Sequence, residues 1–141
     1  MKISDLIPKP LSATVVLRGK EQTLTPITGA QRAQIRAAFP RPSAPMTMVN
    51  GTAVANEGDG FYQTTMDSWL AKTRAAEFAI AVGLTTADGK TYAEASAPTA
   101  WLTEASKIVL DQLTDAEVVV CVGAANEQIA ATMRRPEVRG N

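Results

Sequence analysis

The residue types that most often carry acid–base chemistry or bind metals are scarce in this sequence. The chain has no histidine and a single cysteine, Cys121. Histidine is the commonest general base and metal ligand, and a zinc site needs several Cys or His ligands. We therefore expect no metal site and no cofactor. Cys121 lies in the apolar run "VVVCV" and is expected to be a small core residue.

Two close pairs of carboxylates are the remaining groups that could transfer protons. Asp115 and Glu117 stand in "TDAE", where the dipole of an expected helix favours acidic residues in the first turn. Glu57 and Asp59 stand in a glycine-rich stretch that lacks the spacing of a calcium-binding loop. There is no phosphate-binding loop of the form G-x-x-x-x-G-K-[ST], and no lysine has a diagnostic spacing from a serine. The sequence therefore predicts a protein that is not an enzyme and has no catalytic residue.

The charges of the chain cancel overall but are unevenly distributed. Residues 1–42 carry seven basic side chains against two acidic ones, a net charge of +5, so residues 43–141 carry −5. A net charge of zero gives no overall field that would hold nucleic acid or an anionic membrane. The uneven distribution fits either a solvated surface or a surface that complements another copy or an acidic partner.

No signal for export or membrane insertion is visible. The first twelve residues, "MKISDLIPKPLS", lack the long apolar core of a signal peptide, and no apolar run approaches the length of a membrane span. We therefore expect a cytoplasmic protein with no membrane partner.

Local patterns predict an α+β fold that is mainly α, with an N-terminal β-hairpin followed by a small bundle of about four helices. Thr28 with Gln31, and Thr114 with Glu117, form the capping-box pattern that starts a helix. The expected order is an extended arm at 1–12, a hairpin at 13–27 that turns at Gly19-Lys20, helices at about 29–39, 61–82, 99–113 and 115–133, and a disordered tail at 134–141, with 13–133 as a single domain.

Two stretches between these elements show no sustained periodicity. Residues 40–60 contain three prolines and three glycines, and we expect a mobile loop that is either a linker or a partner contact. Within it, the apolar segment "MTMV" (residues 46–49) could pair as a short strand on a sheet edge. Residues 83–98 contain an Asp88-Gly89 turn, around which residues 85–92 could form a small hairpin.

The helix expected at 61–82 is apolar on two sides, so it is either central to the fold or shared with a partner. Its aromatic and methionine residues are candidates for partner contact, although each also suits a core, Trp69 above all. Two methionines in the 40–60 loop add adaptable apolar surface, and two arginines share a face of the helix at 29–39. The predicted partner-binding residues are Met46, Met48, Phe61, Met66, Trp69, Phe78, Arg32 and Arg36.

Residues 13–42, "ATVVLRGKEQTLTPITGAQRAQIRAAFPRP", resemble the start of tail assembly chaperones of long-tailed bacteriophages. In that family a short strand pair with an R-G-K/E turn leads into L-x-P-[LI]-[ST] and then a helix. The resemblance implies a protein that binds the long, helical tape-measure protein in the bacterial host cytoplasm, in many copies. It also implies that this partner stays soluble until tail-tube subunits replace the chaperone. No catalytic residue is carried over.

Two other function classes fit the sequence. One is a virion structural component, such as a head–tail connector or a tail-terminator subunit, which should form a closed ring. The other is a small DNA-binding regulator built on the helices at 99–113 and 115–133. The second of these helices opens with "DAEVVVCV", which is acidic and then apolar, whereas a helix that reads the major groove carries Arg, Asn, Gln or Ser there.

Overall fold

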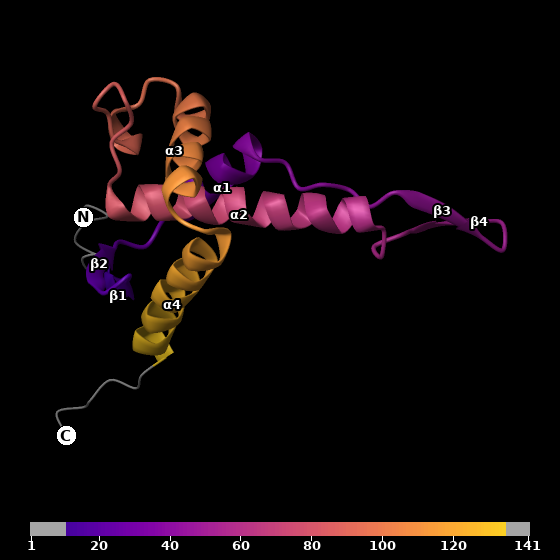
Figure 1. The fold of residues 1–141 in the computed structure, drawn as a ribbon, viewed down its shortest axis with the longest axis horizontal. Coiled ribbons are helices and arrows are strands. Elements are labelled where there is room, and N and C mark those ends of the chain that lie inside the picture. The colour runs from indigo at the N-terminus through magenta and orange to yellow at the C-terminus, as the bar shows by residue number, and fades with distance from the viewer. Residues whose placement is uncertain (1–10, 135–141) are drawn as a thin grey trace, which may run out of the picture.

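A computed structural model of the protein describes residues 11–134, and it has the predicted architecture (Figure 1). A two-stranded antiparallel hairpin precedes four α-helices, so the fold is α+β and mainly α. In chain order the elements are β1 (Ala13–Leu17), β2 (Lys20–Leu24), α1 (Gly29–Ala38), β3 (Met46–Val49), β4 (Thr52–Ala55), α2 (Gly60–Val82), a 3₁₀ helix (Tyr92–Glu94), α3 (Pro98–Gln112) and α4 (Asp115–Arg134). Most of the predicted N-terminal arm and C-terminal tail lies outside the described residues.

The first hairpin turns one residue earlier than predicted. Leu17 pairs with Lys20, which leaves Arg18 and Gly19 as the two turn residues. Both have a positive φ, 52° and 79°, as in the type I′ turn whose twist matches that of the strands. Arginine is uncommon at positive φ, but here its guanidinium is bound by Glu117, with Nε 2.6 Å from Oε2 and Nη2 2.7 Å from Oε1. The ion pair therefore fastens the turn to the start of α4.

Both predicted capping boxes are present. The hydroxyl oxygen of Thr28 accepts the backbone N–H of Gln31 at 3.1 Å, and Gln31 Oε1 accepts the backbone N–H of Thr28 at 2.8 Å. Thr114 and Glu117 make the same two bonds, at 3.1 and 2.9 Å. Because each box satisfies N–H groups that a helix start leaves free, α1 and α4 begin where the sequence predicts.

The second half of α2 is the centre of the core. Ala75, Ala76 and Ala79 are completely buried there, and α1, α3, α4 and β2 all contact this helix. In Figure 1, α3 lies on one side of α2 and α4 on the other. Small side chains allow these neighbours to approach closely, and the larger Leu102 of α3 and Val118 of α4 fill the remaining space with no exposed surface. The sequence allowed this helix to be either central to the fold or shared with a partner, and its second half is central to the fold.

The first half of α2 leaves the bundle and ends in a second hairpin (Figure 1). The segment predicted as a mobile loop instead contains β3 and β4, which pair antiparallel in a sheet of their own. Val49 pairs with Thr52, so Asn50 and Gly51 form the turn, with φ of 51° and 78°. Asn-Gly is the strongest local signal for such a turn. The segment at 46–49 is therefore a strand, but it pairs with β4 and not on the edge of another sheet.

Residues 83–98 form no strand, so the small hairpin considered at 85–92 is wrong. Gly83 ends α2 in the left-handed region, with φ of 71°, as its position predicts. The turn at Asp88 is closed locally, because the Thr86 hydroxyl donates to Asp88 Oδ1 at 2.5 Å. The indole N–H of Trp101 donates to the Lys90 carbonyl at 2.9 Å and ties this connection to α3.

Close packing around α2 predicts a low tolerance for larger side chains. Ala76→Leu adds three carbons where the side chain is fully buried, so we expect it to lower the free energy of unfolding by about 1–3 kcal/mol. Ala37→Leu, at an exposed position of α1, is the matched control and should change it by no more than about 0.5 kcal/mol. Urea denaturation measures both, and equal effects would contradict the packing described.

The Arg18–Glu117 pair predicts an acid-sensitive link between the turn and α4. The Arg18 guanidinium, followed by the Thr114 backbone N–H, lowers the pKa of Glu117 from 4.5 to about 2. Because folding lowers this pKa, the link stabilises the fold above pH 4.5 and that contribution is lost as the pH falls toward 2. In an NMR titration, Arg18→Gln should raise the pKa of Glu117 toward 4.5, while Arg36→Gln should leave it near 2. An unchanged value in Arg18→Gln would refute the assigned cause.

Candidate partner-binding surface

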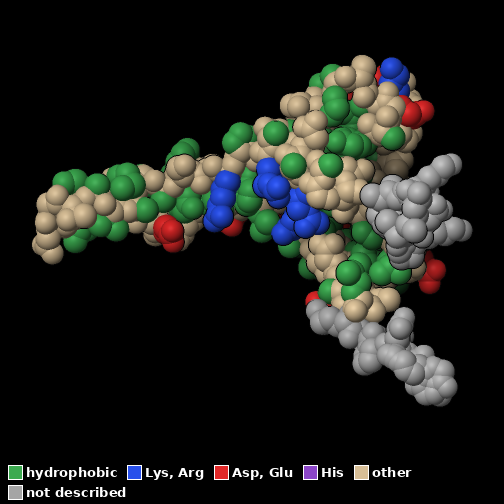
Figure 2. All heavy atoms as spheres, turned by 180° about the vertical axis from the view of Figure 1, so that it is seen from behind, with side chains coloured by type: hydrophobic (Ala, Val, Ile, Leu, Met, Phe, Trp, Pro, Cys, Tyr) green, Lys and Arg blue, Asp and Glu red, His purple; other side chains and the backbone are tan. Residues whose placement is uncertain are grey.

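The exposed apolar side chains gather on the part of the molecule that leaves the bundle. We call residues 42–66, which comprise the β3–β4 hairpin, its flanking segments and the first turns of α2, the protrusion. Three predicted contact residues lie on it with most of their surface exposed: Met46 at 62%, Met48 at 68% and Phe61 at 82%. Figure 2 shows hydrophobic side chains along this projecting part of the molecule. The structure therefore brings these three residues to one solvent-facing region.

The register of the hairpin divides its side chains between two faces. Met46 and Met48 lie on one face, opposite Ala55 and Ala53 of β4. The other face carries four β-branched residues, Thr47, Val49, Thr52 and Val54. All eight strand residues are exposed, and no charged residue occurs between Arg41 and Glu57. Both faces can therefore pack against apolar groups of a partner without stripping water from a charge.

A shallow groove lies at the base of the protrusion, where the proline-rich segment passes the start of α2. Its lining is Pro42, Ser43, Pro45, Asp59, Phe61, Tyr62 and Thr65. Asp59 is the N-cap of α2, since its Oδ1 accepts the backbone N–H of Tyr62 at 2.8 Å. This carboxylate therefore serves the helix start, and the Phe61 and Tyr62 rings remain as the groove's large side chains.

Three of the predicted contact residues are not exposed in this way. Phe78 is only 6% exposed within the core, so the prediction of a partner contact there is wrong; it lies on the half of α2 that the bundle surrounds. Met66 is partly buried. Trp69 is also partly buried, and its indole N–H donates to the Phe39 carbonyl at 2.8 Å, with the Arg41 guanidinium 5.8 Å from the ring centroid. Trp69 thus joins the end of α1 to α2, and it is not among the buried core residues.

The two predicted arginines differ in their partners. Arg32 Nε lies 3.7 Å from Oε1 of Glu77, whose Oε2 lies 2.9 Å from Arg74 Nη1. Arg36 is exposed and has no ion pair among the residues that the structure describes. Figure 2 shows basic side chains gathered between the protrusion and the bundle. Part of the charge separation noted in the sequence is therefore balanced within the chain, at Glu77 and at Glu117.

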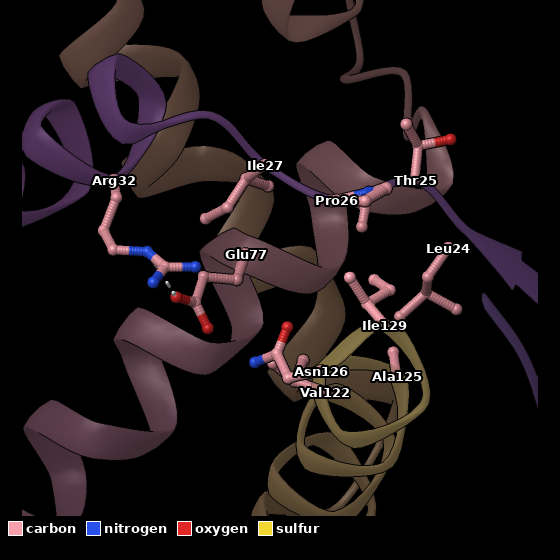
Figure 3. Close-up of a pocket in the computed structure, with 11 residues that line it drawn as sticks. Leu24, Thr25, Pro26, Ile27, Arg32, Glu77, Val122, Ala125, Asn126 and Ile129 are labelled. Carbon is pink, nitrogen blue, oxygen red and sulfur yellow. Dashed lines mark ion pairs between the residues drawn. The ribbon is translucent and has the colours of Figure 1, made fainter. Parts of the chain in front are cut away.

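Glu77 also forms one wall of a small pocket between the β2–α1 connection, α2 and α4 (Figure 3). Its side chain is only 7% exposed, and each carboxylate oxygen has a cationic partner. The other walls are mostly apolar and include Leu24, Ile27, Val122, Ala125 and Ile129. The ion pair with Arg32 links α1 to α2, and the one with Arg74 lies within α2. We assign the pair a structural role.

Within the described part of the chain, nothing resembles a metal centre or a reactive thiol. No group of three or more His, Cys, Asp or Glu side chains there could hold a metal ion. Cys121 is buried in the core as predicted, and burial, followed by the nearby Glu117 charge, raises the pKa of its thiol. Across residues 11–134, no helix has the length and apolar character needed to cross a membrane.

Comparisons of the chain with protein-family models, curated proteins and solved structures gave no match. The function is therefore argued from the surface described above. Sequence reasoning missed Val54, Tyr62 and the hairpin itself as parts of that surface. The Asn50-Gly51 pair between two apolar segments was the signal that could have found them.

The hairpin should unfold independently of the bundle, since β3 and β4 contact chiefly each other. Gly51→Ala places a Cβ at φ 78°, which costs roughly 1–2 kcal/mol in an element that is only marginally stable. We expect faster amide exchange throughout the hairpin and an unchanged urea midpoint for the bundle.

Gly58→Ala is the control, because its added Cβ would meet only Asn56 Oδ1, at an ordinary 3.6 Å. It should leave amide exchange in the hairpin as it is. A lowered urea midpoint in Gly51→Ala would show instead that the hairpin belongs to the cooperative unit of the bundle.

Proposed function

We propose that this protein is a non-enzymatic binding protein, and specifically a tail assembly chaperone of a long-tailed bacteriophage that binds and solubilises the tape-measure protein. The observation that carries the proposal is the protrusion, an exposed surface with apolar side chains on both hairpin faces and a groove at its base. Soluble proteins rarely leave a large apolar region uncovered, and such regions mark interaction sites.

The chemistry of the protrusion suits a long helical partner. An amphipathic helix can lay its apolar stripe in a groove, with large side chains inserted at helical spacing. Phe61 and Tyr62 provide fixed apolar surface at the groove, while Met46 and Met48 can adapt to different side chains. This combination fits a partner that presents many non-identical helical segments to many copies of the same protein.

The segment that resembles the tail assembly chaperones contacts α2, the helix that carries the protrusion. Residues 13–42 form β1, β2 and α1, and Thr25, which directly follows β2, donates its backbone N–H to the Ala81 carbonyl of α2 at 3.0 Å. On this proposal the bundle holds α2, and α2 carries the protrusion to the partner in the host cytoplasm. The tail-tube protein is a second proposed partner, because its subunits would replace the chaperone on the tape-measure protein.

The DNA-regulator alternative gains no support from α4. Val118 is fully buried, Cys121 and Val122 are nearly so, and Glu117 is paired with Arg18. One face of the early turns of this helix therefore packs into the core, and its exposed residues include Asp115 and Val120, which are not base-reading side chains. We retain the virion structural component as the alternative that the experiment must distinguish.

The test is co-expression with the long, helix-rich protein expected to be encoded downstream. We expect this partner to be soluble only with the chaperone, and to co-purify with many copies of it. Phe61→Asp should weaken binding at least about tenfold, because burying such a side chain contributes about 1.5–3 kcal/mol and about 1.4 kcal/mol corresponds to tenfold in affinity. Val120→Asp, at a 68% exposed position on α4, is the matched control and should bind normally.

Three results would contradict the proposal. The partner could stay insoluble with the wild-type protein, or the two variants could behave alike. The purified protein could also form a discrete ring without the partner, which would move it to the structural-component class.

A further inference from the structure

The β3–β4 hairpin has no covering element in the described chain. Every one of its strand residues is exposed, and it forms a two-stranded sheet of its own. A two-stranded hairpin is marginally stable in water, and independent stability needs more strands or a packed helix. Among the residues that the structure describes, neither an additional strand nor a packed helix stabilises this hairpin.

The first hairpin of the same chain shows how these needs are otherwise met. Ala13 and Val15 of β1 are buried, and α4 packs against the strand. The free edge of β1 is also blocked at Thr14, because the Gln128 side-chain amide accepts the Thr14 N–H at 3.2 Å and donates to the Thr14 carbonyl at 2.7 Å. Within residues 11–134, no side chain or helix protects β3 or β4 in this way.

The edges of the second hairpin are open to strand pairing. In an antiparallel hairpin, residue pairs that share backbone hydrogen bonds alternate with pairs that do not. Here the hydrogen-bonded pairs are Val49 with Thr52 and Thr47 with Val54. The hydrogen bond of 2.7 Å from the Asn56 N–H to the Pro45 carbonyl continues this alternation. The backbone groups of residues 46 and 48 on one edge, and of 53 and 55 on the other, therefore point outward. Natural edge strands are usually blunted by charges, prolines or bulges. Here the only proline next to a strand, Pro45, faces inward in the ladder, and residues 42–56 carry no charge.

We infer that the β3–β4 hairpin pairs edge to edge with the same hairpin of a second copy, which forms a four-stranded sheet. A two-fold contact sets one patch against itself, so any charge on it would meet a like charge; the uncharged hairpin avoids that repulsion. The hairpin also lies at the far end of the protrusion (Figure 1), which leaves room for two bundles. The inference rests on the hairpin edges and not on the partner proposed above.

The first test is sedimentation equilibrium of the full chain. We expect the wild-type protein to be a dimer that dissociates on dilution. Met48→Lys puts a charge on β3 and Val54→Lys puts one on β4, and the variant on the paired strand should give the monomer mass. Val120→Lys, on exposed α4 surface, should remain dimeric. An equal thermal unfolding midpoint for the three variants would show that the bundle is intact. A monomeric wild type at its highest soluble concentration, or dimers from both Met48→Lys and Val54→Lys, would overturn the inference.

The second test is amide exchange by NMR at two protein concentrations. Outward amides of one edge, either Met46 and Met48 or Ala53 and Ala55, should become protected as the wild-type concentration rises, and the same edge should stay unprotected in the lysine variant of its own strand. Protection that arises only when another protein is added would refute the second copy as occupant. Failure of this inference leaves the co-expression result intact, because that assay scores Phe61 in the groove.

Discussion

The close packing of three alanines along the second half of α2 is the constraint on which the rest of the structure depends. Ala75, Ala76 and Ala79 have no exposed surface, so α1, α3, α4 and the first hairpin can all approach the same helix. This arrangement fixes the direction of α2. Because the helix is continuous from Gly60 to Val82, its first half must then extend away from the bundle. The exposed surface of the protrusion follows from how the core is built.

The ion pairs fix the positions of chain segments more than they raise the free energy of unfolding. In the Arg18–Glu117 pair the arginine is exposed and the glutamate is partly buried, and ion pairs at the surface contribute little to folding free energy. The pair holds Arg18, a turn residue at positive φ, against the start of α4. Glu77 differs, because its buried carboxylate requires the cations Arg32 and Arg74 beside it. These contacts join the basic N-terminal part of the chain to the acidic remainder, while Arg36 remains open to solvent.

Local signals allowed much of the fold to be predicted, and tertiary context decided the rest. Both capping boxes and Gly83 placed helix ends correctly because each signal acts within a few residues. Periodicity could not separate Phe78 from Phe61, since both belong to one two-sided helix and only the extent of the bundle makes one core and the other surface. The second hairpin was missed because proline and glycine content outweighed the Asn50-Gly51 turn signal. The groove at Phe61 and Tyr62 brings together segments that no sequence pattern connects.

The central claim is that the protrusion, and not the bundle, is the surface that receives the partner. Hydrogen-exchange mass spectrometry of the free protein and of its complex with the tape-measure protein tests this claim most directly. The account predicts new protection in residues 42–66, around Met46, Met48 and Phe61, with little change in α3 and α4. Protection on the outer surfaces of α3 and α4, with exchange in the protrusion unchanged, would contradict it.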